Sequence, residues 1–226
     1  MVVDRLETQL AFILETEKLK QVFRQTLLLG DRRPENDAEH SWHLSLMAVL
    51  LVEHARAEVD LLKVLKMLLI HDVVEIDAGD TFAYDEVANL DKEEREQKAA
   101  DRLFGLLPTD QAGAMRALWD EFELRQSPEA RYAAALDRLQ PLLLNFHGEG
   151  TAWRRHGVKK AQVIARNEHI GEGAPALWAY VRRMIDEAVE LGYLAAEALV
   201  SKKRCSCQRL AQDFSRRMRR QTSLST

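Results

Sequence analysis

The chain has 226 residues, a formal net charge of −4, 46% hydrophobic residues and 30% charged residues. This composition is ordinary for a folded globular protein and excludes global disorder. No apolar run reaches about 18 residues, so we expect no membrane-spanning helix and no membrane partner. The charge is uneven, because residues 201–226 carry +7 and the residues before them carry −11. An acidic body is unlike a nucleic-acid-binding domain, which needs a cationic surface.

The length fits one helical domain at residues 1–200 followed by a basic tail at residues 201–226. Blocks of like charge are commonly solvated and disordered, which is the simplest interpretation of this tail. The two cysteines of the chain, Cys205 and Cys207, both lie in it. They are too few for a disulfide framework, so the sequence predicts a reducing, cytoplasmic setting.

Apolar residues recur at spacings of three and four along the N-terminal half, which is the pattern of amphipathic helices. A first helix is expected over residues 6–14 and a second over residues 37–58. Asp60 predicts the N-cap of a third helix, which ends at His71 and Asp72. This third helix is nearly apolar on all sides, as is typical of a buried helix.

The C-terminal half continues the helical pattern after a loop at residues 80–90. Ser127 followed by Pro128 is a strong helix start, and the helix that it begins should reach about residue 146. Two further helices are expected over residues 158–170 and 175–192. Alternating strand patterns with hairpin turns are almost absent, so the sequence predicts an all-α fold, a single helical bundle.

The adjacent residues His71 and Asp72 are the first candidate site. They end the most apolar helix, where a buried charge without a partner costs several kcal/mol. A divalent cation is one such partner, and imidazole and carboxylate ligands suit Mn, Fe, Co or Zn. Adjacent helical residues point in different directions, so both side chains can meet only beyond the end of the helix. The dipeptide alone leaves a metal site and a chance occurrence both open.

Three segments together resemble a known family. They are Glu39-His40-Ser41-Trp42-His43, His71-Asp72-Val73-Val74-Glu75 and Ala135-Leu136-Asp137-Arg138-Leu139. In this order on helices they resemble the HD-domain phosphohydrolases, and most closely the YfbR-like 5'-deoxynucleotidases. The resemblance also runs through Arg24, Asn36 to His40 and the Gly79-Asp80 step. It covers roughly residues 6–190 and leaves the basic tail out.

The resemblance implies a single HD-domain helical bundle that hydrolyses nucleoside 5'-monophosphates as a homodimer. It implies one divalent ion (Mn, Co, Fe, Zn or Mg) held by His40, His71, Asp72 and Asp137. Glu75 would orient or deprotonate the attacking water, and Asp80 would protonate the leaving oxygen. Arg24 would contact the phosphate of the substrate, for which a guanidinium fork is well suited.

One position departs from the family pattern. The related enzymes carry an aromatic residue directly after the arginine, and this chain carries Gln25 there. The resemblance therefore does not predict a preference for deoxyribose over ribose.

Three other functions stay open at this point. An HD hydrolase of another nucleotide, such as a triphosphate or an alarmone, would use the same ligands. A two-iron HD oxygenase would need further histidines between His71 and Asp137, and this chain has none there. A non-catalytic binding protein that keeps the fold has no need of Glu75, Asp80 and Arg24.

Several nearby side chains have two interpretations each. Asp77 competes with Asp80 as the acid. Glu39 either orients His40 or is an ordinary acidic residue at a helix N-terminus, where the helix dipole favours negative charge. His43 is either a further ligand or a hydrogen-bonded neighbour. Arg32 and Arg33 are either phosphate contacts or ordinary loop charges, and Trp42 is expected in the core or the pocket wall.

Overall fold

Helices make up most of the described chain. The computed structural model describes residues 4–30, 32–85 and 87–196. The α-helices of this part are α1 Arg5–Thr16, α2 Asp37–Leu51, α3 Leu61–Ile70, α4 Glu75–Ala78, α5 Lys92–Phe104, α6 Thr109–Leu124, α7 Pro128–His147, α8 Thr151–His156, α9 Lys160–Asn167, α10 Ile170–Gly173 and α11 Pro175–Glu190. The predicted all-α class is confirmed, and none of these helices is long and apolar enough to cross a membrane.

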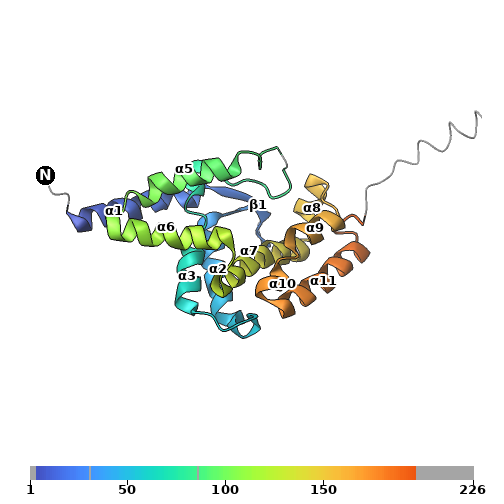
Figure 1. Cartoon of the computed structure of the whole chain (residues 1–226). Helices are drawn as coiled ribbons and strands as arrows, with labels where there is room; N and C mark the ends of the chain where they lie inside the picture. Colours follow the sequence, from blue (N-terminus) through green and yellow to red (C-terminus); the bar gives the residue numbers. More distant parts are fainter. Residues whose placement is uncertain (1–3, 31, 86, 197–226) are drawn as a thin grey trace, which may run out of the picture. The chain divides into compact units, whose positions relative to one another are not determined.

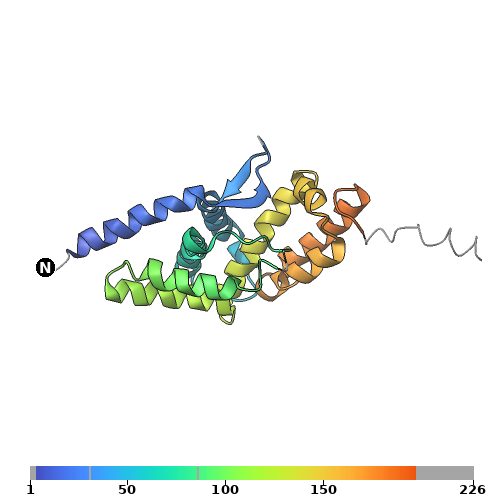
Figure 2. The same ribbon diagram turned by 90° about the horizontal axis from the view of Figure 1, so that it is seen from above.

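Helix α7 lies at the centre of the helical arrangement (Figures 1 and 2) and contacts α2, α3, α6, α10 and α11. Its buried face includes a run of alanines, Ala133, Ala134 and Ala135. Small side chains allow neighbouring helices to approach closely, and the next two residues, Leu136 and Asp137, are also buried, so this stretch of α7 is covered on all sides. The site is therefore built on the most enclosed helix of the described chain.

The predicted helix starts of α3 and α7 are confirmed. The Asp60 carboxylate accepts hydrogen bonds from the backbone N–H groups of Leu62 at 3.0 Å and Lys63 at 3.2 Å. The Ser127 hydroxyl accepts from the backbone N–H of Ala130 at 3.2 Å. Such caps satisfy backbone donors that have no partner within the helix.

A small antiparallel sheet was not predicted. Strands β1 Phe23–Leu27 and β2 Pro34–Asn36 pair with Phe23 opposite Asn36 and Leu27 opposite Pro34. The strands are short and β2 begins with a proline, so neither has the alternation that marks a strand in sequence. The sheet matters for the site because β1 carries Arg24.

Helix α2 is shorter than expected. It ends at Leu51, followed by the 3₁₀ helix η2 Val52–His54, whereas the apolar pattern extends to about residue 58. Beyond η2, the backbone N–H of Arg56 donates to the carbonyl of Gly173 at 2.8 Å. A tertiary hydrogen bond therefore replaces the helical one. A second 3₁₀ helix, η1 Glu17–Gln21, links α1 to β1.

The interpretation of Trp42 as a core residue was wrong. Its side chain is 65% exposed on α2. The apolar face of α1 is also open to solvent, with Leu6, Leu10, Ile13 and Leu14 all exposed. The two core clusters instead draw on α2, α3, α5, α6, α7 and α11, and the buried Trp119 belongs to one of them.

Candidate metal centre and substrate pocket

The end of α3 brings His71 and Asp72 together. The helix ends at Ile70, and His71 is its C-cap, so the chain turns before α4 begins. This turn allows two adjacent side chains to converge, with 3.2 Å between His71 Nε2 and Asp72 Oδ1. The indole Nε1 of the buried Trp119 donates to the carbonyl of His71 at 3.2 Å and helps to hold the turn. The expectation that both side chains meet beyond the helix end agrees with this geometry.

Two further helices bring His40 and Asp137 to the same point. His40 lies in α2 and Asp137 in α7, and His40 Nε2 is 3.0 Å from Asp137 Oδ1. Asp137 Oδ1 is also 3.8 Å from His71 Nε2, and Asp72 Oδ2 is 4.0 Å from His40 Nε2. All four side chains are buried. The structure thus brings together the four residues that the sequence singles out as ligands.

Outer hydrogen bonds hold both Nδ1 atoms, so that both Nε2 atoms face the carboxylates of the centre. His71 Nδ1 donates to the carbonyl of Leu68 at 2.9 Å. His40 Nδ1 donates to Gln140 Oε1 at 3.1 Å, and Gln140 Nε2 donates to Glu35 Oε1 at 2.6 Å. A proton on each Nδ1 leaves the lone pair on Nε2, as is usual for histidine ligands of metals.

This donor set fits a divalent cation. His40, His71 and Asp72 each offer one ligand atom within 4.8 Å of the others. His71 Nε2 is buried without a hydrogen-bond partner, although it faces carboxylates. Burial lowers the pKa of His71, but Asp72 and Asp137 outweigh this effect and raise it to about 10. The centre therefore attracts positive charge, and imidazole with carboxylate suits borderline and hard ions.

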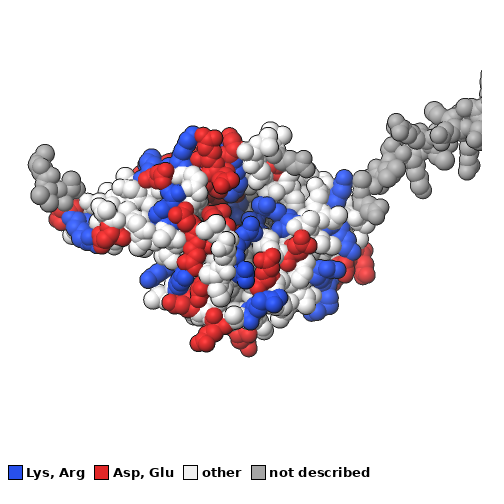
Figure 3. Space-filling view, viewed as in Figure 1, with Lys and Arg blue, Asp and Glu red and all other residues white. Residues whose placement is uncertain are grey.

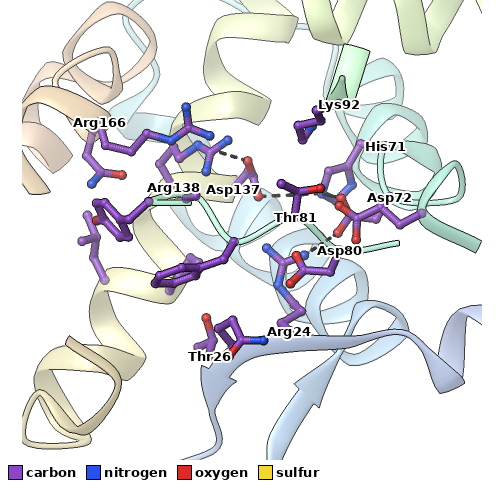
Figure 4. A pocket seen from close by; sticks show the side chains of 18 of the residues that line it. Arg24, Thr26, His71, Asp72, Asp80, Thr81, Lys92, Asp137, Arg138 and Arg166 are labelled. Carbon is purple, nitrogen blue, oxygen red and sulfur yellow. Dashed lines mark hydrogen bonds and ion pairs between the residues drawn. The ribbon is translucent and has the colours of Figure 1, made fainter. Parts of the chain in front are cut away.

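Arg24 reaches the centre from β1. Its Nη1 donates to Asp72 Oδ2 at 2.8 Å and to Asp37 Oδ1 at 3.1 Å. Figure 4 shows the guanidinium group directed toward Asp72 and Asp80 across the pocket floor. Burial of this guanidinium is offset by the surrounding carboxylates, which raise the pKa of Arg24 well above its ordinary value. The arginine is therefore charged and held in place.

Two carboxyl groups follow the centre along the chain. Glu75 is the first residue of α4, and burial together with Asp72 raises its pKa well above the ordinary value. Asp80 follows Gly79, whose φ of 74° lies in the left-handed region that glycine favours. Burial also raises the pKa of Asp80, although Arg24 opposes this. Asp80 lines the pocket, whereas Asp77 accepts from Arg102 Nη2 at 2.7 Å and is not among the lining residues.

The contacts of Glu39 and His43 distinguish between the two interpretations of each side chain. Glu39 accepts from Arg33 Nη1 at 2.9 Å and closes a capping box with Asn36, so it stabilises the start of α2. The orientation of His40 comes from Gln140 instead. His43 Nδ1 lies 3.3 Å from Gln140 Nε2, which favours the hydrogen-bonded neighbour.

The remaining arginines of the hairpin point elsewhere. Arg32 forms an ion pair with Glu149 at 3.6 Å, and neither Arg32 nor Arg33 lines the pocket of the centre. Their interpretation as loop charges is the better one.

Charged groups of both signs line the pocket beside the centre. Figure 3 shows basic and acidic side chains facing each other across a hollow near the middle of this face. The sequence did not single out Gln140, Glu35 and Arg166, and it gave Arg138 no role. Gln140 lies three residues after Asp137 on the same helix, which is a signal that sequence can give. Glu35 and Arg166 reach the site through tertiary packing, and no local pattern marks them.

The fold and this donor set define a class: an all-helical protein with a buried histidine and aspartate centre for a divalent cation. The family comparison agrees, because a model described as HD domain matches residues 16–178, more than half of the chain. The chain belongs to the HD-domain family.

Relatives with a named activity match part of the chain. The protein named 5'-deoxynucleotidase HDDC2 of Danio rerio is 29% identical over 61% of this chain and 68% of its own length. The protein of the same name in Homo sapiens is 29% identical over 59% of this chain and 65% of its length. In Saccharomyces cerevisiae, 5'-deoxynucleotidase YBR242W is 30% identical over 62% of this chain and 60% of its length. The chain thus spans about two thirds of the length of these relatives.

Solved structures agree with the family. A predicted metal-dependent phosphohydrolase from Magnetospirillum magnetotacticum MS-1 is 57% identical, with a TM-score of 0.81. That match covers 84% of this chain and 96% of the other. A conserved hypothetical protein from Pyrococcus furiosus is 26% identical with a TM-score of 0.51, covering 79% of this chain and 98% of the other.

Proposed function

We propose that this chain is a metal-dependent 5'-nucleotidase that converts (deoxy)nucleoside 5'-monophosphates to nucleoside and phosphate. One observation carries the proposal: two imidazoles and two carboxylates converge at one end of a pocket that also presents Arg24 and Asp80. The names of the relatives as 5'-deoxynucleotidases support the substrate class.

In this proposal His40, His71, Asp72 and Asp137 hold one divalent ion, which is Mn, Co, Fe, Zn or Mg. When bound, such an ion lowers the pKa of water and polarises a phosphoryl oxygen. The support is the convergence of the four side chains and the outer hydrogen bonds at both Nδ1 atoms, which turn the two Nε2 atoms toward the carboxylates.

Three further residues act on the substrate. Arg24 binds phosphoryl oxygens and offsets their negative charge. Glu75 accepts the proton of the attacking water as a carboxylate, a charged form that the neighbouring Arg24 favours because it opposes the rise in the pKa of Glu75. Asp80 donates its proton to the oxygen of the leaving nucleoside, so that no strongly basic alkoxide departs. Its raised pKa supports this role, because only the protonated form can donate.

A phosphate-release screen tests this function. We expect nucleoside monophosphates to be cleaved far better than diphosphates or triphosphates, with Mn, Co, Mg and Zn compared as the added ion. Arg24→Ala should lower turnover strongly and leave the metal content unchanged, whereas Arg33→Ala, in the same hairpin but outside the pocket, should resemble wild type. Triphosphates as the best substrates would favour a triphosphatase or alarmone hydrolase instead.

The same screen addresses the sugar preference. Gln25 lines the pocket at the position where related enzymes carry an aromatic residue. Comparison of each deoxynucleotide with its ribonucleotide, in wild type and in Gln25→Trp, shows whether this side chain governs the choice between the two sugars.

We also propose that the chain forms a homodimer through α2. Trp42, Leu46, Val49 and Leu50 follow helical spacing and are between 43% and 65% exposed. A contiguous apolar surface of this kind is typical of a protein interface. Light scattering should give twice the chain mass for wild type and a single mass for Leu46→Glu.

Leu124→Glu is the matched control, because Leu124 is 64% exposed at the end of α6, away from the α2 stripe. It should leave the mass unchanged. A monomeric wild type would refute the dimer.

We further propose a cytoplasmic location. The support is the use of cysteine, because two cysteines are too few for a disulfide framework. Both cysteines, like the predicted basic tail, lie outside the described residues. Recovery of the protein in a membrane or extracellular fraction would contradict this location.

A further inference from the structure

The pocket beside the metal centre has two charged ends. At one end lie His71, Asp72 and Asp80. Arg138 and Arg166 lie at the opposite end, where Figure 4 shows their guanidinium groups together. Arg138 comes from α7 and Arg166 from α9, so two separate helices bring the same charge to one place. Two like charges held close together repel each other, and a fold keeps such an arrangement only at a cost.

The basic groups nearer the centre have carboxylate partners. Arg24 donates to both Asp72 and Asp37. Lys92, which also lines the pocket, donates to Glu96 one turn along α5. These charges are therefore neutralised within the protein.

The arginine pair lacks this neutralisation. Arg138 Nε lies 3.5 Å from Asp137 Oδ2, and Asp137 is already shared with His40 and His71. Among the residues that the structure describes, Arg166 has no carboxylate within ion-pair distance, and its buried Nε has no hydrogen-bond partner. The neighbouring Arg138, with burial, lowers the pKa of Arg166 to about 10.

An ordinary structural role does not account for this pair. A structural arginine in a partly buried position normally has a carboxylate or carbonyl partner, because an unpaired buried charge is costly. The carbonyl of a nucleobase would supply a hydrogen-bond acceptor but no charge to offset the repulsion. A phosphate supplies both, since its oxygens match a guanidinium fork and its negative charge neutralises the pair.

The geometry of Asp137 separates this pair from the reacting phosphate. Asp137 directs Oδ1 toward the two imidazoles and Oδ2 toward Arg138. A whole carboxylate group therefore lies between the metal centre and the arginine pair. An anion on Arg138 and Arg166 is a different group from the one bound at the centre.

We propose that Arg138 and Arg166 form a second phosphate subsite, and that the preferred substrate is a nucleotide with a further phosphate besides the one removed. The inference rests on the proposed nucleotidase function and narrows its substrate class. The second phosphate is on the 3' oxygen of the sugar, because a β-phosphate of a 5' chain would leave together with the 5' phosphate when the bond to the 5' oxygen is broken.

Equilibrium binding to the metal-free protein tests this subsite without hydrolysis. Calorimetry would compare 2'-deoxyadenosine 5'-monophosphate with the 3',5'-bisphosphate and with the 5'-diphosphate, in a buffer that contains a chelator. Wild type should bind the 3',5'-bisphosphate about 10-fold or more tighter than it binds the monophosphate or the 5'-diphosphate. A gain in affinity for the 5'-diphosphate alone would contradict the position of the second phosphate on the 3' oxygen.

Arg166→Gln and Arg138→Gln should each reduce this preference to about one, while Arg183→Gln should preserve it. Arg183 is exposed on α11 over the ring of Tyr180 and does not line the pocket, so it controls for the loss of one positive charge. Equal affinity of wild type for all three probes would overturn the proposal. The proposal would also be overturned if Arg166→Gln lowered the affinity for the monophosphate as much as the affinity for the other probes. The arginine pair would then bind the reacting phosphate.

Hydrolysis separates this inference from the proposed function. If metal-loaded wild type cleaves none of the probes, the nucleotidase function fails, whereas the binding preference still decides the subsite. If the enzyme cleaves the monophosphate but binds the three probes equally, the function stands and the subsite fails.

Discussion

Charged residues differ in burial and in number of partners between the metal centre and the surface of helix α5. In the centre, Asp72 and Asp137 are buried and each contacts more than one partner within 4 Å. On α5, Lys98 and Glu94 form an ion pair while their side chains are 74% and 71% exposed. Water screens the exposed pair, whereas the buried carboxylates are largely removed from solvent and their interactions are screened much less. The same residue types therefore serve function in one place and solubility in the other.

Substitutions of charged residues should therefore have larger effects in the centre than on α5. A buried charge that loses its partner keeps its desolvation cost, so the effect is large. An exposed charge that loses its partner is simply hydrated. The size of the effect of a substitution in each region therefore tests the assignment of the residues in the centre.

The largest effect is expected for Asp72→Ala. Loss of this carboxylate removes a ligand and leaves Arg24 with Asp37 as its closest ion-pair partner. We expect the purified variant to contain no stoichiometric metal and to lose essentially all phosphate release, as measured by elemental analysis and a phosphate assay. Asp77→Ala is the control, because Asp77 pairs with Arg102 and not with the residues of the centre. This variant should retain both its metal content and its phosphate release. Full metal occupancy in Asp72→Ala would refute the ligand assignment.

The next effect distinguishes the two carboxyl groups that follow the centre. Asp80→Asn should slow hydrolysis of a nucleoside monophosphate about 10²–10⁴-fold, because an acid no longer protonates the leaving oxygen. The same variant should barely affect p-nitrophenyl phosphate, whose leaving group needs no proton. Turnover of both substrates by the purified variant measures this split.

Glu75→Gln should instead slow both substrates to a similar extent, since each requires the same activated water. Equal losses on both substrates in Asp80→Asn would contradict the role of Asp80 and return attention to Asp77.

Local patterns in the sequence predict the fold class and mark His71 and Asp72, whereas the full set of four candidate ligands came from the resemblance to the HD-domain family. His71 and Asp72 interrupt an apolar helix, and a buried polar pair of this kind is visible in the sequence itself. Asp137 lies on a helix whose start is marked by Ser127 and Pro128. Periodicity and caps are local properties, so they can be read without coordinates.

The rest of the site depends on contacts between distant residues. The hairpin that positions Arg24 has strands of five and three residues, too short for a strand pattern. Gln140 bonds with His40, 100 positions earlier in the chain. Arg138 and Arg166 meet only because α7 and α9 pack near the same pocket. Neither composition nor spacing encodes such pairs, and the exposed Trp42 shows the opposite error, because an aromatic residue in sequence does not reveal which face is covered.

Gln140→Ala should produce an intermediate effect. The amide joins His40 to Glu35, and its loss removes the acceptor that holds the proton on His40 Nδ1. Loss of such an outer partner typically weakens metal binding about 10–100-fold without abolishing it. Titration with a fluorescent metal indicator would measure the change. Gln111→Ala removes an amide that bonds only Gln9 among the described hydrogen bonds and should bind metal as wild type does. Unchanged affinity in Gln140→Ala would show that His40 is oriented by other means.

The smallest effect is expected for Lys98→Gln on α5. Its partner Glu94 lies one helical turn away, and both side chains are largely exposed. Exposed pairs with this spacing contribute about 0.3–0.5 kcal/mol, and salt weakens them further. The free energy of unfolding, measured with a chemical denaturant, should therefore differ from that of wild type by no more than about this amount. The rate of phosphate release should not change. Glutamine keeps the helix propensity of lysine, so the comparison isolates the charge. A loss of several kcal/mol would contradict the comparison, because it would mean that an exposed ion pair on α5 contributes as much as a buried one in the centre.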